Sequence, residues 1–431
     1  MADWFEAQEA ALNAVLGDYL ERRKNPLAIE MQFYEAGRPI PLTTEGLRAA
    51  HRELTPRLVI LVHGMAQTEL CWAFSEDPAS SYGALLHDEL GLTPFYLRYN
   101  SGRHVSQNGR DLALLIERLL AAYPLTVEDI SLIGHSMGGL VIRSACYYAE
   151  QLGHRWLART RRAFYLGAPH LGSPYEKAGH LLSVVLAAID HPVVRLTGTL
   201  GNLRSAGVKD LRNGSLLDED WQGQDLDASD AKRPRPVPLA ASMAHYLVAG
   251  TLTRNENHLL AHLFGDALVR LGSATDPGHQ ASLPPEHFAI FPGISHPRLA
   301  HSPAVYGALR AWFGEPPSTF SRTPSASTAP SAAPPSSRSS SQARLERLDA
   351  YRALVQDAIE HGATAVEQVQ EELSRRPYDL LEQIPPLEAP TQLVRSAHFA
   401  AVRGVYGVIR AVNAVTGAAL HGGIDWLKKM G

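Results

Sequence analysis

A serine flanked by glycines, in the segment Gly134-His135-Ser136-Met137-Gly138, limits the possible folds more than any other stretch of the sequence. An apolar run at residues 130–133 precedes this segment, and a helix-like apolar stretch at 140–149 follows it. A serine on a sharp strand-to-helix turn needs glycine neighbours, because the strand and the helix approach too closely for larger side chains. The pattern therefore predicts a nucleophile elbow with Ser136 as the nucleophile, and an ordinary glycine-rich turn is the alternative.

Apolar runs alternate with helical patterns on both sides of this elbow. Strands are predicted at residues 58–62, 94–99, 130–133, 162–166, 246–252 and 288–291, and helices at 81–90, 107–122 and 304–313. A continuous apolar run is typical of a parallel strand that is buried on both faces. Strands that alternate with helices favour a parallel sheet covered by helices on both sides, so we expect an α/β fold.

The flanking segments suggest a division of the chain into several parts. Residues 1–57 predict an amphipathic helix at 2–23 and two edge strands, and residues 58–314 form the expected catalytic domain. An insertion at about 174–243 carries an apolar helix at 178–189. A long insertion at the carboxyl edge of such a sheet is typical of a lid or cap, and an ordinary packing helix is the alternative.

The C-terminal part differs in composition from the rest. Residues 315–342 consist almost wholly of Pro, Ser, Thr and Ala, which predicts a flexible linker. Residues 343–431 predict a helical module of two long helices, and Arg403 and Arg410 argue against a membrane span in the second. We expect this module to pack on the core or to self-associate as a homo-oligomer; peripheral contact with a lipid surface is the alternative.

Composition excludes some partners and compartments. The formal net charge is only -4 and no basic stripe stands out, so we expect no nucleic-acid partner. Two cysteines, Cys71 and Cys146, are too few for a disulfide framework and suggest free thiols. Because residues 1–23 lack the pattern of a signal peptide and no apolar run reaches about 18 residues, we expect a cytoplasmic protein.

A serine nucleophile needs a histidine and a carboxylate, which follow it in this fold class in the order acid, then histidine. For the acid, Asp266 follows a glycine beyond the strand at 246–252, and Asp276 competes with it. A rival reading makes His258, His262 and Asp266 metal ligands on one helical face, although Gly265 interrupts that helix.

Three histidines compete for the role of the base. His296 ends the loop after the last predicted strand, which makes it our first choice over His301 and His287. A solvated surface histidine is the alternative for each of them.

Near the first buried strand, His63-Gly64 is a second signal, because a strand that ends in His-Gly commonly supplies half of an oxyanion hole. A plain exit from strand to loop is the alternative there.

Taken in order, several motifs resemble the α/β-hydrolase superfamily and, within it, the bacterial triacylglycerol lipase and esterase group. The resemblance covers about residues 58–313 and rests on five motifs, at 62–65, 134–139, 167–173, 265–269 and 296–305. It implies Ser136 as nucleophile, Asp266 as acid and His296 as base, with an oxyanion hole formed by the backbone N–H groups of Met65 and Met137.

The resemblance implies a serine carboxylic ester hydrolase that acts on an ester or lipid substrate through an acyl-enzyme intermediate. We expect no cofactor and no metal, because no calcium site is recognisable in the sequence. Two other functions stay open. One is a scaffold at a lipid or granule surface that retains a hydrolase core, and the other is acyl transfer or amide cleavage by the same three residues.

Overall fold

A computed structural model describes most of the N-terminal three quarters of the chain and only parts of the rest. The described residues are 2–77, 79–172, 205–224, 226, 234–251 and 283–314, with single residues and short stretches between 349 and 425. The chain divides into two compact units, one made of residues 1–24, 28–189 and 204–323, the other of 25–27, 190–203 and 324–431. The predicted lid helix at 178–189 and the predicted linker at 315–342 lie outside the described residues.

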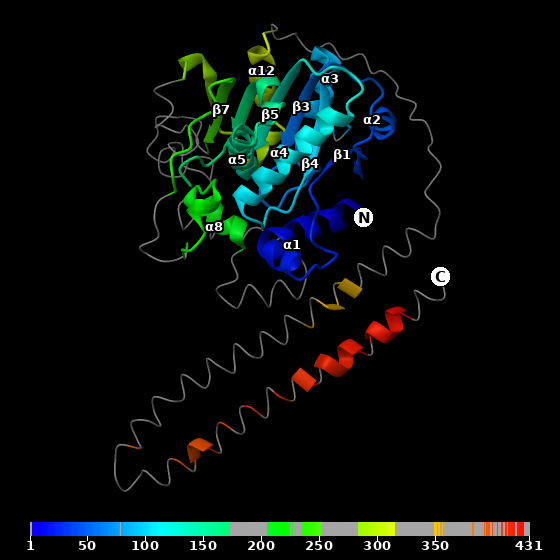
Figure 1. Ribbon diagram of the computed structural model, residues 1–431, viewed down its shortest axis with the longest axis vertical. Helices are drawn as coiled ribbons and strands as arrows, with labels where there is room; N and C mark the ends of the chain where they lie inside the picture. Colours follow the sequence, from blue (N-terminus) through cyan, green and yellow to red (C-terminus); the bar gives the residue numbers. More distant parts are fainter. Residues whose placement is uncertain are drawn as a thin grey trace. The chain divides into compact units, whose positions relative to one another are not determined.

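An eight-stranded sheet forms the centre of the first unit (Figure 1). Its strands are β1 (Gln32–Glu35), β2 (Arg38–Pro39), β3 (Arg57–Val62), β4 (Thr93–Arg98), β5 (Asp129–His135), β6 (Thr160–Leu166), β7 (Ala244–Thr251) and β8 (Phe288–Pro292). They lie in the order β2-β1-β4-β3-β5-β6-β7-β8, and all strands from β3 to β8 run parallel. Among these described strands, the antiparallel pairs are β1 with β2 and β1 with β4, at one edge of the sheet. This is the α/β-hydrolase fold, as the sequence predicted.

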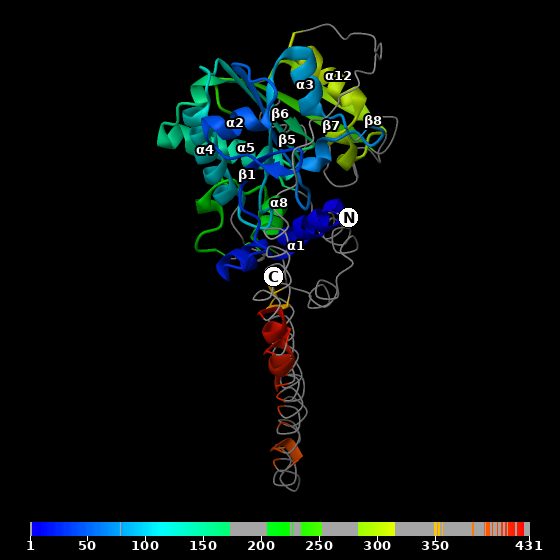
Figure 2. The same cartoon turned by 90° about the vertical axis from the view of Figure 1, so that its right-hand side faces the viewer.

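Helices cover both faces of the sheet (Figure 2). One face carries α4 (Val105–Ala122) and α5 (Met137–Leu152), and the other carries α3 (Tyr82–Leu90) and α12 (Pro303–Trp312). Between the sheet and the second pair lies an apolar cluster that includes Ile133, Phe164 and Tyr82. Residues 130–135 of β5 are all buried. Since successive side chains of a strand point to opposite faces, both faces of β5 are covered, and its carboxyl end is held within the core.

Two further helices pack together near the carboxyl ends of the strands. They are α1 (Ala2–Arg22) and α8 (Ala206–Asn213), which lie next to each other in the first unit (Figure 1). The hydroxyl of Ser205, which caps α8, donates to the carbonyl of Ala14 at 2.6 Å. A Cβ atom on Gly102, in the loop after β4, would come within 2.0 Å of Asn13 O, so α1 lies directly against that loop.

The remaining short elements of the first unit connect these layers. They are α2 (Thr44–Ala50) and the 3-10 turns η1 (Glu69–Trp72), η2 (Leu157–Arg159), η3 (Asp218–Asp220), η4 (Pro285–His287) and η5 (His296–Ala300).

Cys71 and Cys146 are free thiols, as their number suggested. Burial raises the pKa of the Cys146 thiol to about 12, so this thiol stays protonated at neutral pH.

The described residues of the second unit are largely helical. Asn413 Nδ2 donates to the carbonyl of Gln356 at 2.8 Å, and His421 Nδ1 lies 3.0 Å from a carboxylate oxygen of Asp349. Gly417 leaves room for the Gln356 side chain, which a Cβ atom would meet at 2.0 Å. The segments around 349–356 and 413–421 therefore lie side by side. In the parts of both units that the structure describes, no helix has the length and apolarity needed to cross a bilayer.

Candidate active site

Ser136 occupies the sharp turn between β5 and α5. Its backbone has φ 52° and ψ -122°, a conformation that residues other than glycine rarely adopt. Two hydrogen bonds hold the turn: Ser136 N–H donates to Leu166 O at 2.8 Å, and Gly139 N–H donates to Ser136 O at 3.0 Å. Strained backbone that is held in this way is concentrated at functional sites.

The glycines that flank Ser136 make room for this turn. A Cβ atom on Gly134 would lie 2.7 Å from the carbonyl carbon of Gly138. A Cβ atom on Gly138 would lie 2.2 Å from Val62 O and 2.6 Å from His63 O, both of them backbone atoms. The steric reason given for the pattern in the sequence is thus confirmed.

The loop after β3 lies beside Ser136, because a Cβ atom on Gly64 would be 3.0 Å from Ser136 Cβ. His63 orients this loop. Its Nε2 accepts from Tyr99 N–H at 3.4 Å, so its Nδ1 carries the proton and donates to Gly64 O at 2.7 Å. In a trans peptide the C=O of one residue and the N–H of the next point in opposite directions, so this bond also aims Met65 N–H away from the His63 ring.

Two backbone N–H groups near Ser136 lack an acceptor within the described ranges. Met65 N–H belongs to the peptide that His63 orients, and Met137 N–H is the first of α5. The first N–H groups of a helix have no partner inside the helix, and the helix dipole adds positive potential there. These two groups are the ones that the sequence predicts to form an oxyanion hole.

Polar contacts behind the loop hold it in place. Ala66 has a positive φ of 59°, and its N–H donates to Ser101 Oγ at 3.2 Å. Further along, Glu69 forms a buried bidentate pair with Arg98, in which Nε donates to Oε2 at 2.6 Å. Arg98 also pairs with Glu6 of α1 at 2.9 Å. The end of β4, the start of α1 and the loop are thereby joined.

His63 should make stability depend on pH. Burial is the largest effect on its imidazole and lowers the pKa from 6.5 to about 4. Because the unfolded chain binds this proton first, stability present at neutral pH is lost as the pH falls from about 6.5 towards 4. The loss between pH 7 and pH 5 should be about 2 kcal/mol.

We expect His63→Asn, which keeps a donor in the place of Nδ1 but cannot titrate, to flatten this part of the profile. Urea unfolding at pH 7 and pH 5 measures the difference between the variant and the parent. Equal pH slopes in the two proteins would rule out His63 as the source.

The structure distinguishes the three histidines predicted as bases. His296 begins η5 and is 3% exposed. A Cβ atom on Gly167, at the end of β6, would lie 3.0 Å from its Nδ1, and its carbonyl lies 3.0 Å from His135 Nε2. His296 therefore lies beside the elbow. Among the described contacts, no hydrogen bond joins Ser136 Oγ to His296, which is common in enzymes without bound substrate.

The other two histidines have different surroundings. His301 Nδ1 makes a 3.3 Å contact with Cys71 O. His287 precedes β8, so it lies at the amino end of a parallel strand, whereas Ser136 follows the carboxyl end of β5. Asp266, Asp276, His258 and His262 lie outside the described residues. Within the residues that are described, no group of three or more metal-ligating side chains occurs.

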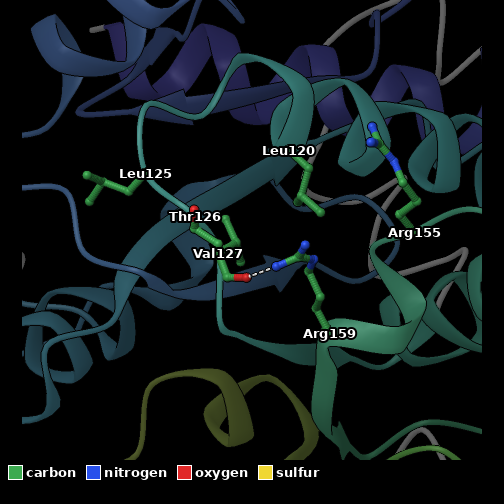
Figure 3. Close-up of a pocket in the computed structure, with 6 residues that line it drawn as sticks. All are labelled: Leu120, Leu125, Thr126, Val127, Arg155 and Arg159. Carbon is green, nitrogen blue, oxygen red and sulfur yellow. Dashed lines mark hydrogen bonds between the residues drawn. The ribbon is translucent and has the colours of Figure 1, made fainter.

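One cavity lies away from this site. It has a volume of about 230 Å³ and is lined by Leu120, Leu125, Thr126, Val127, Arg155 and Arg159 (Figure 3). Val127 precedes β5, so the cavity is near the amino end of the strand whose carboxyl end carries Ser136. Arg159 donates to the carbonyl of Val127 across it. We assign this cavity no part in the chemistry.

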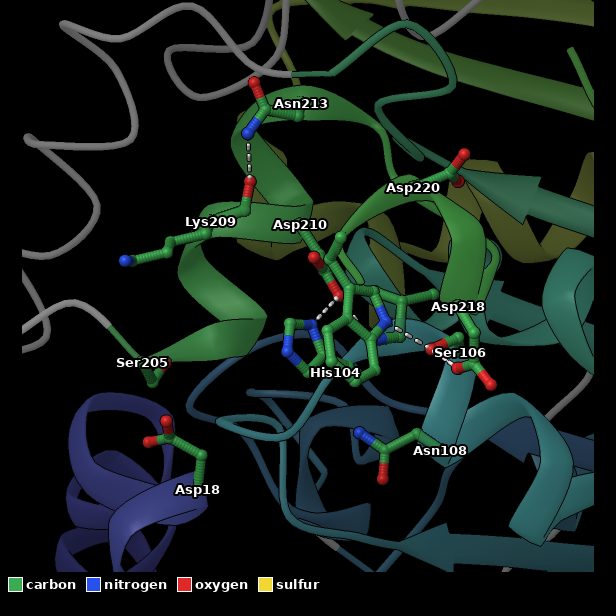
Figure 4. Close-up of polar contacts among 12 residues, drawn as sticks. Asp18, His104, Ser106, Asn108, Ser205, Lys209, Asp210, Asn213, Asp218 and Asp220 are labelled. Atoms are coloured by element: carbon green, nitrogen blue, oxygen red, sulfur yellow. Dashed lines mark hydrogen bonds and ion pairs between the residues drawn. The ribbon is translucent and has the colours of Figure 1, made fainter. Parts of the chain in front are cut away.

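The described part of the predicted insertion is fixed to α4 (Figure 4). Asp210 of α8 accepts from Val105 N–H at 2.8 Å and pairs with His104 Nδ1 at 3.0 Å. Burial raises the pKa of the Asp210 carboxyl, and the bond from His104 opposes that change. The His104 ring also stacks on Trp221 at 3.8 Å, beside a cavity of about 200 Å³. The sequence reasoning predicted no helix at 206–213 and so missed α8.

Sequence reasoning also missed two polar residues near the elbow. Gln67 accepts from Gly64 N–H at 2.9 Å and contacts His135 Nδ1 at 2.9 Å. In the sequence analysis, His135 was included in the serine motif but was assigned no role. The available signal was a glutamine three residues after His-Gly, together with a histidine next to the serine, and neither pattern reveals a contact by itself.

Residues 53–213, less than half of the chain, match the model of a family described as "Putative serine esterase (DUF676)", and this match supports hydrolase activity. No curated protein sequence matches the chain. The matched part contains Ser136, Met65 and Met137 but not the segments that carry Asp266 and His296.

Several solved structures are also similar to parts of the chain. A lipase-esterase related protein from Clostridium acetobutylicum has 14% identity and a TM-score of 0.33, covering 60% of this chain and 94% of its own. A thermophilic esterase from Thermogutta terrifontis has 15% identity and a TM-score of 0.34, covering 60% and 89%. A thioesterase of prodiginine biosynthesis from Streptomyces coelicolor has 18% identity and a TM-score of 0.33, covering 60% and 90%. The fold assignment rests on the strand order and the elbow of this chain.

Proposed function

We propose that this α/β-hydrolase-fold protein is a serine carboxylic ester hydrolase, of the esterase or lipase type, that works through an acyl-enzyme intermediate. The observation that carries the proposal is the strained Ser136, with φ 52°, beside two backbone N–H groups that lack an acceptor within the described ranges. A nucleophile and oxyanion donors side by side are the two parts that acyl transfer needs first.

In the proposed reaction, Ser136 Oγ attacks the ester carbonyl while His296 takes its proton. The tetrahedral oxyanion accepts hydrogen bonds from Met65 N–H and Met137 N–H. His296 then returns the proton to the leaving alcohol, and the acyl group stays on Ser136. Water attacks this acyl-enzyme, with His296 again accepting the proton, and the carboxylic acid leaves. Asp266 is proposed to hold the imidazolium of His296.

Two exposed leucines at the edge of the sheet that carries Ser136 support a substrate with an apolar acyl group. Leu70 in η1 is 41% exposed, and Leu171, in the loop after β6, is 61% exposed. Both follow strands at their carboxyl ends, the edge of the sheet where Ser136 lies. Acyl transfer to an alcohol or amine other than water would use the same groups, and product analysis with an added alcohol distinguishes transfer from hydrolysis.

Pre-steady-state kinetics with p-nitrophenyl butyrate tests the proposal. Because acylation releases p-nitrophenolate before water attacks, we expect a burst close to one equivalent per chain, followed by slower turnover, if deacylation limits the rate. If acylation limits it, added hydroxylamine should trap the acyl group as butyrohydroxamate. No ester turnover at all across short and medium acyl chains would contradict the proposal.

A further inference from the structure

His135 joins two loops that the proposed mechanism needs. Its Nε2 lies 3.0 Å from the backbone carbonyl oxygen of His296 in η5. On the other side, its Nδ1 lies 2.9 Å from Oε1 of Gln67, in the loop that carries Met65. The rings of His135 and His296 are 4.9 Å apart. His135 itself is fixed between β5 and Ser136, with only 1% of its surface exposed.

Gln67 extends the connection to the oxyanion donors. Its Oε1 accepts from Gly64 N–H at 2.9 Å, and Gly64 O accepts from His63. The backbone on both sides of Gly64 is thus held by side chains. The residue that follows Gly64 is Met65, whose N–H is one of the two proposed oxyanion donors.

The protonation state of His135 decides how the connection works. Burial is the largest effect and lowers the pKa of its imidazole well below 6.5; the charges of His296, His301 and His63 lower it further, and the hydrogen bond to the His296 carbonyl opposes them. A neutral imidazole has one N–H, and the carbonyl of His296 can only accept, so Nε2 donates to that carbonyl. Gln67 Oε1 already accepts from Gly64 N–H and cannot donate to the unprotonated Nδ1, so the neutral His135 makes its hydrogen bond to the His296 carbonyl and touches Gln67 at Nδ1.

We propose that Gln67 and His135 are positioning residues, which set the oxyanion loop and the loop of the base at the correct distance from Ser136. The inference rests on the proposed function and adds to it the residues that hold the site together. A neutral His135 also places no positive charge next to His296, which must become an imidazolium during the reaction.

Two substitutions of His135 separate positioning from packing. His135→Gln can place an amide N–H where Nε2 donates to the His296 carbonyl, whereas His135→Leu fills the space without a donor. We expect His135→Leu to lower kcat for a soluble p-nitrophenyl ester about 10- to 100-fold, because the base shifts relative to Ser136. We expect His135→Gln to keep kcat within about threefold of the parent, with KM nearly unchanged in both.

The pair Gln67→Leu and His135→Leu tests the connection between the loops. If the residues act as one bridge, the double variant should lose hardly more kcat than His135→Leu alone. Equal kcat in His135→Gln and His135→Leu, or additive losses in the double variant, would overturn the proposal.

Each variant is also labelled with a fluorophosphonate until the reaction is complete. This labelling distinguishes failure of the positioning role from failure of the proposed function. Complete labelling of Ser136 in His135→Leu, with normal kcat, contradicts only the positioning role. Absence of Ser136 labelling in the parent protein contradicts the proposed function itself.

Discussion

Ser136→Ala is expected to lower ester hydrolysis by about 10⁴-fold or more while the protein stays folded. The substitution removes the atom that attacks the carbonyl and leaves the two backbone N–H groups in place. Only the background that oxyanion stabilisation and binding provide should then remain. Since Ser136 Oγ makes no hydrogen bond within the described residues, its loss should cost the fold little.

Initial rates with p-nitrophenyl butyrate, together with the thermal midpoint of unfolding, measure both parts of this prediction. We expect the midpoint to change by no more than about 2 °C, because alanine accepts the same backbone conformation about as well as serine does. Ester turnover within tenfold of the parent would show that another residue is the nucleophile.

Gly138→Ala is the second substitution with a large expected effect. Its new methyl group would lie 2.2 Å from the backbone oxygen of Val62, which cannot rotate away as a side chain could. The start of α5, and with it Met137 N–H, must therefore move away from β3. A displacement of about 1 Å at the reacting groups costs on the order of 10²-fold in rate. Overpacking should also lower the free energy of unfolding by about 1–3 kcal/mol.

Gly307→Ala is the matched control for this substitution. Gly307 also lies in a helix, α12, but a Cβ atom there would meet nothing within 4 Å. Alanine favours the helix by about 1 kcal/mol over glycine, so this variant should be slightly more stable and fully active. Stability is read from urea unfolding and activity from kcat. If Gly138→Ala behaved like Gly307→Ala in both, the close approach of α5 to β3 would be wrong.

The order of strands and helices could be predicted because it rests on local patterns. The run at 58–62 became β3 (Arg57–Val62), and the periodic stretch at 107–122 became α4 (Val105–Ala122). A continuous apolar run indicates a strand that is buried on both faces, and apolar residues with a 3.6-residue period indicate a helix that is buried on one face. The elbow was also predictable from its glycines, although the sequence did not show that the clash at Gly138 is with Val62 and His63 at the end of β3.

Contacts between distant segments could not be predicted in the same way. Glu69 pairs with Arg98, and Asp210 reaches back to His104, across more than 100 residues in the second case. Periodicity identifies which face of an element is buried, but it does not identify the partner of a polar side chain. For the same reason the sequence did not connect Gln67 with His135.

The direction of the strands favours His296 over His287 as the base. His287 and His296 both flank the predicted strand at 288–291, and the motif order alone allowed either. Because β8 runs parallel to β5, the residue before it and the residues after it lie at opposite edges of the sheet. Only His296 lies at the edge where Ser136 is found.

The most direct test of the central claim is to locate the covalent adduct that a fluorophosphonate forms with the protein. Phosphonylation copies the first step of the proposed reaction, since the reagent needs a nucleophile beside an oxyanion hole. Intact mass should rise by one phosphonyl group per chain, and peptide sequencing should find that group on Ser136. Ester turnover that continues after complete labelling, or an adduct on any other residue, would contradict the assignment of Ser136 as the nucleophile.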